Sequence, residues 1–466
     1  MSIVIRNTLT GKKEKFVPLE EGKVKMYVCG VTVYDDIHMG HARSMIVFDM
    51  IVRYLRYRGF DVVHHTNFTD IDDKIINRAA EEGIDALELS ARYIENYFED
   101  ASKLGINKAD YYPKASEEIP AIIKMVEEII DSGFAYVAED GSVYFSVDKV
   151  KDYGRLTGQK LENMESSGRI VLDEGKKNPM DFAVWKSAKE GEIAWDSPWG
   201  KGRPGWHIEC SAMIREHLGD EIDIHGGGND LVFPHHENEI LQTEAVTGKP
   251  LSKYWVHNGM LQFEGEKMSK SVGNFFRVRD VAEKYDQYVI RFYFLNTHYM
   301  SPLSYSEELL EDAKTSLERL VNNYTDLKAY VKQGPAEGED ASGLIEEYRT
   351  KFIAAMDDDF NTRAAIEEIY QLTRITNKSM ADKTLGRGGA EQLVSLLDEF
   401  DGVLGIYPET AGDDGTLDSV MDILIDLRAE LRERKAYDLS DMIRDRLGEA
   451  GIRLEDSGDG AKWKRI

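Results

Sequence analysis

The stretch His38-Met39-Gly40-His41 lies where a strand pattern gives way to a helix pattern. Residues 23–28 before it alternate between polar and apolar side chains, as residues of a β-strand do. Residues 42–58 after it are rich in helix formers and carry an apolar stripe at helical spacing. The histidines are therefore predicted at the N-terminus of a helix, where free N–H groups and a partial positive charge suit a triphosphate. Gly40 would let a base or a phosphate approach the backbone closely, although two histidines that only cap a helix would give the same pattern.

A second short stretch, Lys267-Met268-Ser269-Lys270-Ser271, lies between Gly265 and Gly273. Glycine on both sides predicts a mobile loop. Its two lysines and two serines could hold a pyrophosphate that gains negative charge in a transition state. A solvated, charged surface loop would have the same composition, so this stretch alone leaves the function open.

The chain has only two cysteines, Cys29 and Cys210. The N-terminus lacks the apolar core of a signal peptide, and no stretch approaches the roughly 18 apolar residues of a membrane span, so we expect a cytoplasmic protein that does not contact a membrane. Thiols in that compartment are buried or metal-bound rather than joined in a disulfide. His235 and Glu239 are four residues apart and share one helical face, so these four side chains could form a tetrahedral zinc shell. Cysteines far apart in a sequence are more often core residues, and their spacing alone leaves both interpretations open.

Several blocks of the chain are similar to one known family. The HMGH and KMSKS stretches look like the HxGH and KMSKS signatures of class I aminoacyl-tRNA synthetases. The wider match resembles cysteinyl-tRNA synthetase and falls in family order at residues 27–35 (YVCGVTVYD), 67–74 (NFTDIDDK), 205–211 (GWHIECS) and 233–239 (FPHHENE). Val31 stands where the family usually has proline, and Met39 where it often has isoleucine, but both lie between functional positions.

The resemblance implies an α/β fold with a Rossmann-like nucleotide-binding domain. That domain would be split by a connective insert and followed by a helical bundle and a small C-terminal anticodon-side domain. The expected boundaries are 1–115 and 204–280 for the split catalytic domain, 116–203 for the insert, 281–404 for the stem-contact region and bundle, and 405–466 for the last unit. The insert would meet the acceptor end of tRNA. From about residue 281 onward the sequence pattern is nearly all helical, with loops expected at 333–343 and 405–416.

The resemblance also implies ATP-dependent attachment of L-cysteine to tRNA(Cys) through a cysteinyl-adenylate, with no DNA partner. Mg-ATP would be a substrate, and one zinc per chain would select cysteine over serine because zinc prefers thiolate to a neutral hydroxyl. The expected catalytic residues are His38, His41, Lys267 and Lys270, and the ATP contacts are these four together with Gly40 and Ser269. The expected substrate contacts are Gly30, Thr69, Trp206, His225 and Asp230, and the zinc ligands are Cys29, Cys210, His235 and Glu239.

The formal net charge of −27 contrasts with a nucleic-acid partner, because a uniformly acidic surface would repel phosphate. Basic residues must therefore cluster locally. Residues 462–465 (KWKR) form one such cluster, with an aromatic ring available for stacking on a base. A frayed, soluble terminus is the alternative interpretation of this tail.

Two other functions fit parts of the sequence. One is the ATP-dependent ligase that joins cysteine to an amino sugar in mycothiol synthesis, which resembles the catalytic fold but lacks the C-terminal unit. The other is a non-catalytic, zinc-stabilised RNA-binding relative, against which the intact HMGH and KMSKS stretches count. Cysteine-dependent exchange of pyrophosphate into ATP, followed by a tRNA transfer assay, separates the three.

Overall fold

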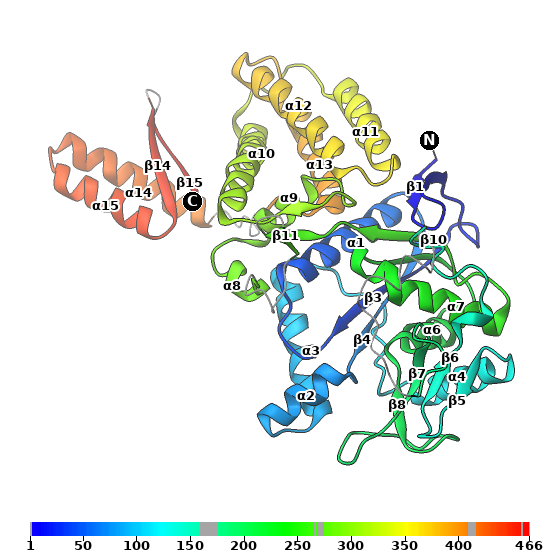
Figure 1. The fold of residues 1–466 in the computed structure, drawn as a ribbon. Helices are drawn as coiled ribbons and strands as arrows, with labels where there is room; N and C mark the ends of the chain where they lie inside the picture. Colours follow the sequence, from blue (N-terminus) through cyan, green and yellow to red (C-terminus); the bar gives the residue numbers. More distant parts are fainter. Residues whose placement is uncertain are drawn as a thin grey trace. The chain divides into compact units, whose positions relative to one another are not determined.

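Four parallel strands in the order β10-β9-β3-β4 form the central sheet of the computed structural model (Figure 1). β3 (Lys23–Thr32) and β4 (Asp61–Thr69) come from the start of the chain, whereas β9 (Ile222–Gly228) and β10 (Ser252–Asn258) return after a long insertion. The predicted split α/β fold is confirmed by this topology. The structure describes residues 2–158, 175–263, 266–267, 275–408, 416–457 and 460–465.

Helix α1 (Met39–Tyr57) connects β3 to β4 and begins at the HMGH stretch, as predicted. Its apolar stripe is buried, and so are the charged side chains of Arg43 and Asp49. Burial extends around the helix because α1 packs against the sheet and also against α9 (Gln287–Leu295) and α13 (Arg387–Leu404). This two-sided packing fixes the position of the histidines at its N-terminus.

The insertion between β4 and β9 carries its own core. Helix α4 (Ile119–Asp131) is the predicted amphipathic helix, and its buried face packs with an antiparallel sheet in the order β5-β6-β7-β8. α6 (Trp206–His217) then leads back to the central sheet. The other elements between β4 and α6 are α2 (Asp73–Glu82), α3 (Ala86–Lys103), β5 (Ala135–Val137), β6 (Val143–Phe145), β7 (Phe182–Ser187) and β8 (Gly202–Pro204).

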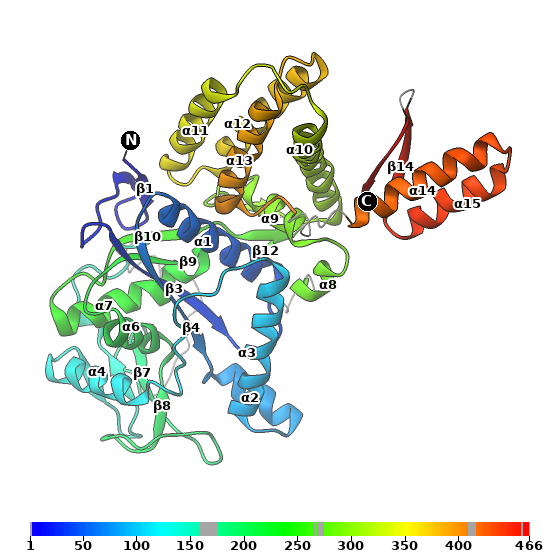
Figure 2. The ribbon, with the colours of Figure 1, turned by 180° about the vertical axis from the view of Figure 1, so that it is seen from behind.

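From α8 (Val278–Ala282) onward the chain is largely helical, as the sequence predicts from about residue 281. Helices α10 (Glu307–Gln333) and α11 (Ser342–Asp357) flank the loop expected near residues 333–343. The remaining elements up to residue 407 are β1 (Val4–Asn7), β2 (Lys12–Lys15), α7 (Glu237–Thr247), β11 (Leu261–Phe263), β12 (Glu266–Lys267), α8 (Val278–Ala282), β13 (Leu303–Ser304), α10 (Glu307–Gln333), α11 (Ser342–Asp357) and α12 (Thr362–Ala381). Figure 2 shows α10 to α13 from behind, as one group of helices.

The chain divides into two compact units, residues 1–407 and 408–466. The second unit contains α14 (Thr416–Glu433), α15 (Tyr437–Glu449) and a hairpin of β14 (Ile452–Ser457) and β15 (Gly460–Arg465). The expectation of an almost wholly helical C-terminal region is wrong at this hairpin. The tail is therefore a paired strand in which Trp463 lies opposite Leu454, rather than a frayed terminus. The alternation of basic residues with Ala461 and Trp463 was the period-two signal for it.

No helix within the described ranges is long and apolar enough to cross a membrane. The cytoplasmic location stays a prediction.

Candidate active site

The two histidines of the HMGH stretch cap the N-terminus of α1 reciprocally. His38 is the N-cap residue, and its Nδ1 accepts a hydrogen bond from the backbone N–H of His41 at 3.2 Å. His41 Nδ1 accepts from the backbone N–H of His38 at 3.3 Å, and the rings stack with centroids 3.7 Å apart. A Cβ on Gly40 would lie 2.8 Å from His38 Cε1, so the glycine is required by the stacked imidazoles themselves.

This capping fixes which ring nitrogen of each imidazole carries the proton. An Nδ1 that accepts a hydrogen bond leaves Nε2 as the protonated nitrogen of the neutral ring. Both Nε2–H groups are then donors at a helix N-terminus, beside a cavity that both histidines line. The arrangement can hold phosphate oxygens, as the sequence suggested. The two histidines also cap the helix, which was the alternative interpretation of the same stretch.

The turn of the chain at Cys29 and Gly30 depends on a break in strand pairing. The register of β3 against β4 shifts between Val28 and Val31, so the intervening residues leave the regular ladder. Gly30 donates its N–H to Asn67 Oδ1 at 2.9 Å. A Cβ at Gly30 would lie 1.7 Å from the carbonyl oxygen of Asn67, so no other residue fits there without movement of the backbone.

The four predicted metal ligands come together although they come from distant parts of the sequence. Their donor atoms all lie within 4.8 Å of one another. Cys29 Sγ is 3.6 Å from Cys210 Sγ and 3.4 Å from Glu239 Oε1. His235 Nε2 is 3.1 Å from the same carboxylate oxygen. The bulge in β3, the first turns of α6 and the start of α7 supply these side chains.

The chemistry of this donor set fits zinc. Two sulfur ligands of a tetrahedral zinc lie about 3.8 Å apart, close to the 3.6 Å between the two Sγ atoms. Burial lowers the pKa of His235 to about 3, which keeps its imidazole neutral and able to coordinate. Burial also raises the pKa of the Cys29 thiol, so without a cation the protonated form is favoured. A divalent cation would compensate the burial of thiolates and a carboxylate at one place.

A second possible donor set shares two of these residues. Cys29, His225, His236 and Glu239 also have donor atoms within 4.8 Å of one another, and His236 Nε2 is 3.3 Å from Cys29 Sγ. His236 was not singled out from the sequence, although it is adjacent to His235 in a quoted block. The pattern of residues four apart favoured His235, whereas the helix start at 232–236 is irregular and turns both rings toward the thiol.

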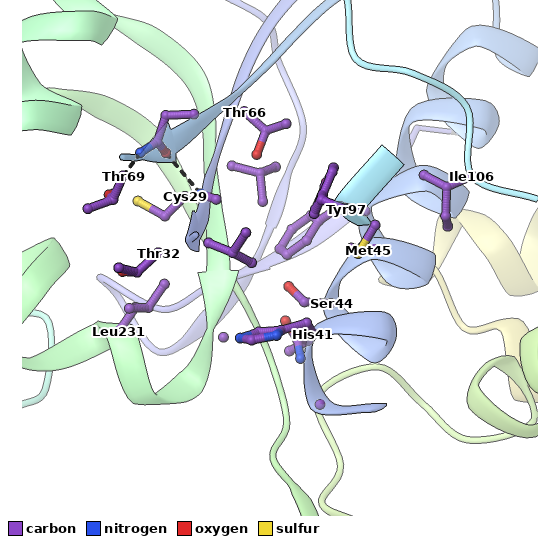
Figure 3. A pocket seen from close by; sticks show the side chains of 18 of the residues that line it. Cys29, Thr32, His41, Ser44, Met45, Thr66, Thr69, Tyr97, Ile106 and Leu231 are labelled. Atoms are coloured by element: carbon purple, nitrogen blue, oxygen red, sulfur yellow. Dashed lines mark hydrogen bonds between the residues drawn. The ribbon is translucent and has the colours of Figure 1, made fainter. Parts of the chain in front are cut away.

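A cavity of 630 Å³ connects the histidine cap with the cysteines. Figure 3 shows Cys29 and Thr69 on one side of it and His41 with Ser44 on another. Of the five expected substrate contacts, Gly30, Thr69, Trp206 and Asp230 line the cavity. Trp206 stacks on His235 with ring centroids 4.3 Å apart, so its indole lies between the donor set and the open space.

His225, the fifth expected contact, has a different position. It is fully buried and is not among the described residues that line the cavity. Its Nε2 lies 2.8 Å from Glu239 Oε2, so it holds the carboxylate of an expected ligand. The structure thus places His225 against the carboxylate of Glu239 and away from the described lining of the cavity.

The second signature lies largely outside the described residues. The backbone of Lys267 belongs to β12, which pairs with β11. Ser269 and Lys270 fall outside the described ranges.

Comparisons with known proteins agree along the whole chain. The family model of the tRNA synthetases class I (C) catalytic domain matches residues 15–315, and that of the DALR domain matches residues 351–408. A cysteine–tRNA ligase of Carboxydothermus hydrogenoformans is 50% identical over 470 aligned positions, covering 99% of this chain and 100% of that protein. The cysteine–tRNA ligase of Bacillus velezensis is 49% identical over 468 positions and covers 100% of both chains.

Solved structures show the same fold at low sequence identity. A Mycobacterium tuberculosis methionyl-tRNA synthetase in complex with methionyl-adenylate has a TM-score of 0.65 and 17% identity, and the match covers 86% of this chain and 94% of that chain. A putative arginyl-tRNA synthetase from Campylobacter jejuni has a TM-score of 0.56 and 13% identity, with coverage of 83% and 94%.

Proposed function

This chain belongs to the cysteinyl-tRNA synthetase family of class I, and we propose that it recognises cysteine through one zinc ion held by Cys29, Cys210, His235 and Glu239. The enzyme is a cysteine–tRNA ligase, which activates cysteine with ATP as a cysteinyl-adenylate and attaches it to tRNA(Cys). Both alternatives from the sequence are disfavoured, because cysteine–tRNA ligases match from end to end at about half identity. The observation that carries the zinc proposal is the 3.6 Å separation of two thiols that lie 181 positions apart in the sequence.

The proposed zinc would supply selectivity. When bound, it prefers a thiolate to a neutral hydroxyl, whereas apolar packing separates such near-isosteres poorly. The chain contributes the orientation: His225 holds Glu239, and Trp206 covers His235 on the cavity side. Cysteine would enter with its sulfur toward Cys29 and Cys210.

At the other end of the cavity we assign Mg-ATP to the cap of α1. The Nε2–H groups of His38 and His41 would donate to phosphate oxygens as negative charge moves toward the leaving pyrophosphate. Gly40 leaves room for the ring of His38, which a Cβ at this position would meet at 2.8 Å. Lys267, Ser269 and Lys270 are proposed, from their sequence signature, to hold the pyrophosphate from the opposite side.

The tRNA would extend from the insert to the last unit. We propose that residues 116–203 meet the acceptor end, that 281–404 contact the stem, and that 405–466 face the anticodon. The DALR match at 351–408 supports a tRNA-side role for the helices α11 to α13.

The test compares metal content with amino-acid selection. Protein purified without chelators should contain one zinc per chain, and Cys210→Ser should contain less. The same variant should raise the KM for cysteine in pyrophosphate exchange more than the KM for ATP, and should lower the preference for cysteine over serine. Ile214→Leu, a volume-conserving change on the same buried helix, is the matched control. A wild-type protein that contains no zinc and still prefers cysteine to serine to the full extent would contradict the proposal.

A further inference from the structure

Three polar side chains form a hydrogen-bonded row beside the two cysteines, which begins at the cavity wall with Asn67 and Thr69 and ends at the buried Glu209. Asn67 Oδ1 accepts from the backbone N–H of Gly30, and Asn67 Nδ2 donates to Thr69 Oγ1 at 3.4 Å. Thr69 Oγ1 in turn donates to Glu209 Oε2 at 2.9 Å. The dashed lines in Figure 3 mark the bonds of this row among the residues drawn, close to Cys29 and Thr69.

This row determines what the Thr69 hydroxyl can offer to a ligand. A hydroxyl has one proton to donate and two lone pairs that accept. Thr69 donates its proton to Glu209, and Asn67 occupies one lone pair. Thr69 lines the cavity, so toward the cavity its oxygen presents an acceptor only.

Glu209 has an environment that is costly for a structural residue. It is fully buried, and its Oε1 has no hydrogen-bond partner among the described residues. Unpaired buried carboxylate oxygens destabilise a fold, and such groups call for a functional reason. Burial raises the pKa of Glu209 well above its usual range, and the carbonyl oxygen of a neutral carboxyl still accepts from Thr69.

We propose that Glu209 and Asn67 are positioning residues that fix Thr69 as the hydrogen-bond acceptor for the α-ammonium group of cysteine. This inference rests on the proposed function, since it places the substrate sulfur at Cys29 and Cys210. In cysteine only two carbons separate the sulfur from the ammonium nitrogen, so the ammonium acceptor has to lie near the sulfur ligands. The row meets that condition: Asn67 Oδ1 is 3.7 Å from Cys210 Sγ, and Glu209 precedes Cys210 in α6.

The proposal defines a class of accepted ligands. A free α-ammonium thiol offers a charged donor to Thr69, whereas an N-acylated or des-amino thiol does not. The zinc would thus select the thiol, and the row would require a free amino group. Serine carries the same ammonium, so the row would add affinity without adding discrimination against serine.

The test uses two small thiols as competitive inhibitors of pyrophosphate exchange. Cysteamine carries an ammonium and no carboxylate, and 3-mercaptopropionate carries a carboxylate and no ammonium. Thr69→Val should weaken cysteamine and cysteine by about 10- to 100-fold, the range of a hydrogen bond to a charged group, and should leave 3-mercaptopropionate unchanged. Thr69→Ser, which restores the hydroxyl, should rescue cysteamine binding.

A double-mutant cycle tests the positioning role. Glu209→Met, of similar size but without an acceptor, should weaken cysteamine by about tenfold in the wild-type background and not at all in Thr69→Val. If this variant fails to fold or to bind zinc, Glu209→Gln takes its place, with a smaller, roughly threefold, loss in the same pattern because the amide keeps one acceptor oxygen for Thr69. Equal losses in both backgrounds, or equal losses for both thiols, would overturn the proposal.

Two controls separate this inference from the zinc proposal. Cys210→Ser should weaken both thiols alike, so a failure of the zinc proposal shows in 3-mercaptopropionate and a failure of the row shows only in cysteamine. Thr243→Val makes the same substitution at a buried hydroxyl that has no hydrogen-bond partner among the described residues. This variant should change the affinity for neither cysteamine nor 3-mercaptopropionate.

Discussion

Each imidazole at the start of α1 has two nitrogens, and the fold uses only one of them for capping. His38 Nδ1 accepts from His41 N–H, so the donation to phosphate proposed above falls to its Nε2. Capping and catalysis can therefore be separated by substitution.

Asparagine at position 38 should keep the helix and lose the reaction. Its side-chain oxygen is a good N-cap acceptor, so His38→Asn should unfold close to the wild type, whereas His38→Ala should lose about 1 kcal/mol. Both variants should lower the turnover number of pyrophosphate exchange by roughly 100-fold or more, because the oriented Nε2–H is gone. Wild-type turnover in His38→Asn would mean that the histidine only caps the helix.

His64 on β4 should make stability depend on pH. Burial lowers its pKa to about 4, whereas in the unfolded chain the pKa is about 6.5. Between these values the unfolded state binds more protons, so the free energy of unfolding falls as pH decreases from 6.5 toward 4, and this group has no effect above that window. His64→Gln should reduce the slope of the free energy of unfolding against pH. The upper limit of this reduction is about 1.4 kcal/mol per pH unit, and the observed value should be smaller because the side chain is only partly buried.

Urea titrations at several pH values from 4.5 to 8 measure this slope. The wild type and His64→Gln should run parallel above pH 7 and diverge below 6.5. Parallel curves throughout would show that His64 takes up its proton equally in both states.

The turn between α11 and α12 forms hydrogen bonds with strand β1 and with Tyr299, which are distant from it in the sequence. Asp359 accepts at one oxygen from the backbone N–H of Arg6 in β1 and from the hydroxyl of Tyr299, each at 2.8 Å. Its own backbone N–H donates to Val4. Asp359 has φ +66°, a left-handed conformation that aspartate and asparagine tolerate better than most residues.

Removing this carboxylate should loosen the joint between the helical region and the N-terminal strand. Asp359→Ala leaves two donors unpaired in a buried turn and should cost about 2–4 kcal/mol in chemical denaturation. Asp359→Asn keeps an acceptor oxygen and the tolerance for positive φ, so it should cost less than about 1 kcal/mol. Zinc content should be the same in both variants, and equal stability of the two would contradict the role of the hydrogen bonds.

At the scale of the whole molecule, the two units should be separable. The core of the first unit extends to Ile406 and Tyr407, whose N–H groups donate to Asp401. Deletion of residues 409–466 therefore keeps that core intact. The truncated enzyme should retain cysteine-dependent pyrophosphate exchange and lose tRNA charging through weaker tRNA binding.

Salt dependence and one aromatic residue refine this test in the full chain. Changing Lys462, Lys464 and Arg465 together should flatten the slope of log affinity for tRNA against log salt by about two to three ions if all three contact phosphates. Trp463→Ala should cost about 1–3 kcal/mol without changing the slope if the ring stacks on a base. Undiminished charging by the truncated, folded enzyme would refute the role of the second unit.

Local features of this protein followed from the sequence by itself. The helix at residue 39, the amphipathic helix at 119 and the break after 333 were predictable because periodicity and capping act between residues a few positions apart. The donor types of the proposed metal site were also predictable, since two thiols, an imidazole and a carboxylate stand in the family blocks and are a donor set that suits zinc.

Only the tertiary structure decided how those residues meet. The bulge at Cys29 and Gly30, the position of His225 behind Glu239, and the row that joins Thr69 to Glu209 depend on contacts between strands and helices far apart in the chain. Such contacts leave no periodic trace in the sequence, because packing of the folded chain sets them rather than local propensity. The sequence therefore determined which groups are present, and the fold determined which of them face the cavity and which hold the others in place.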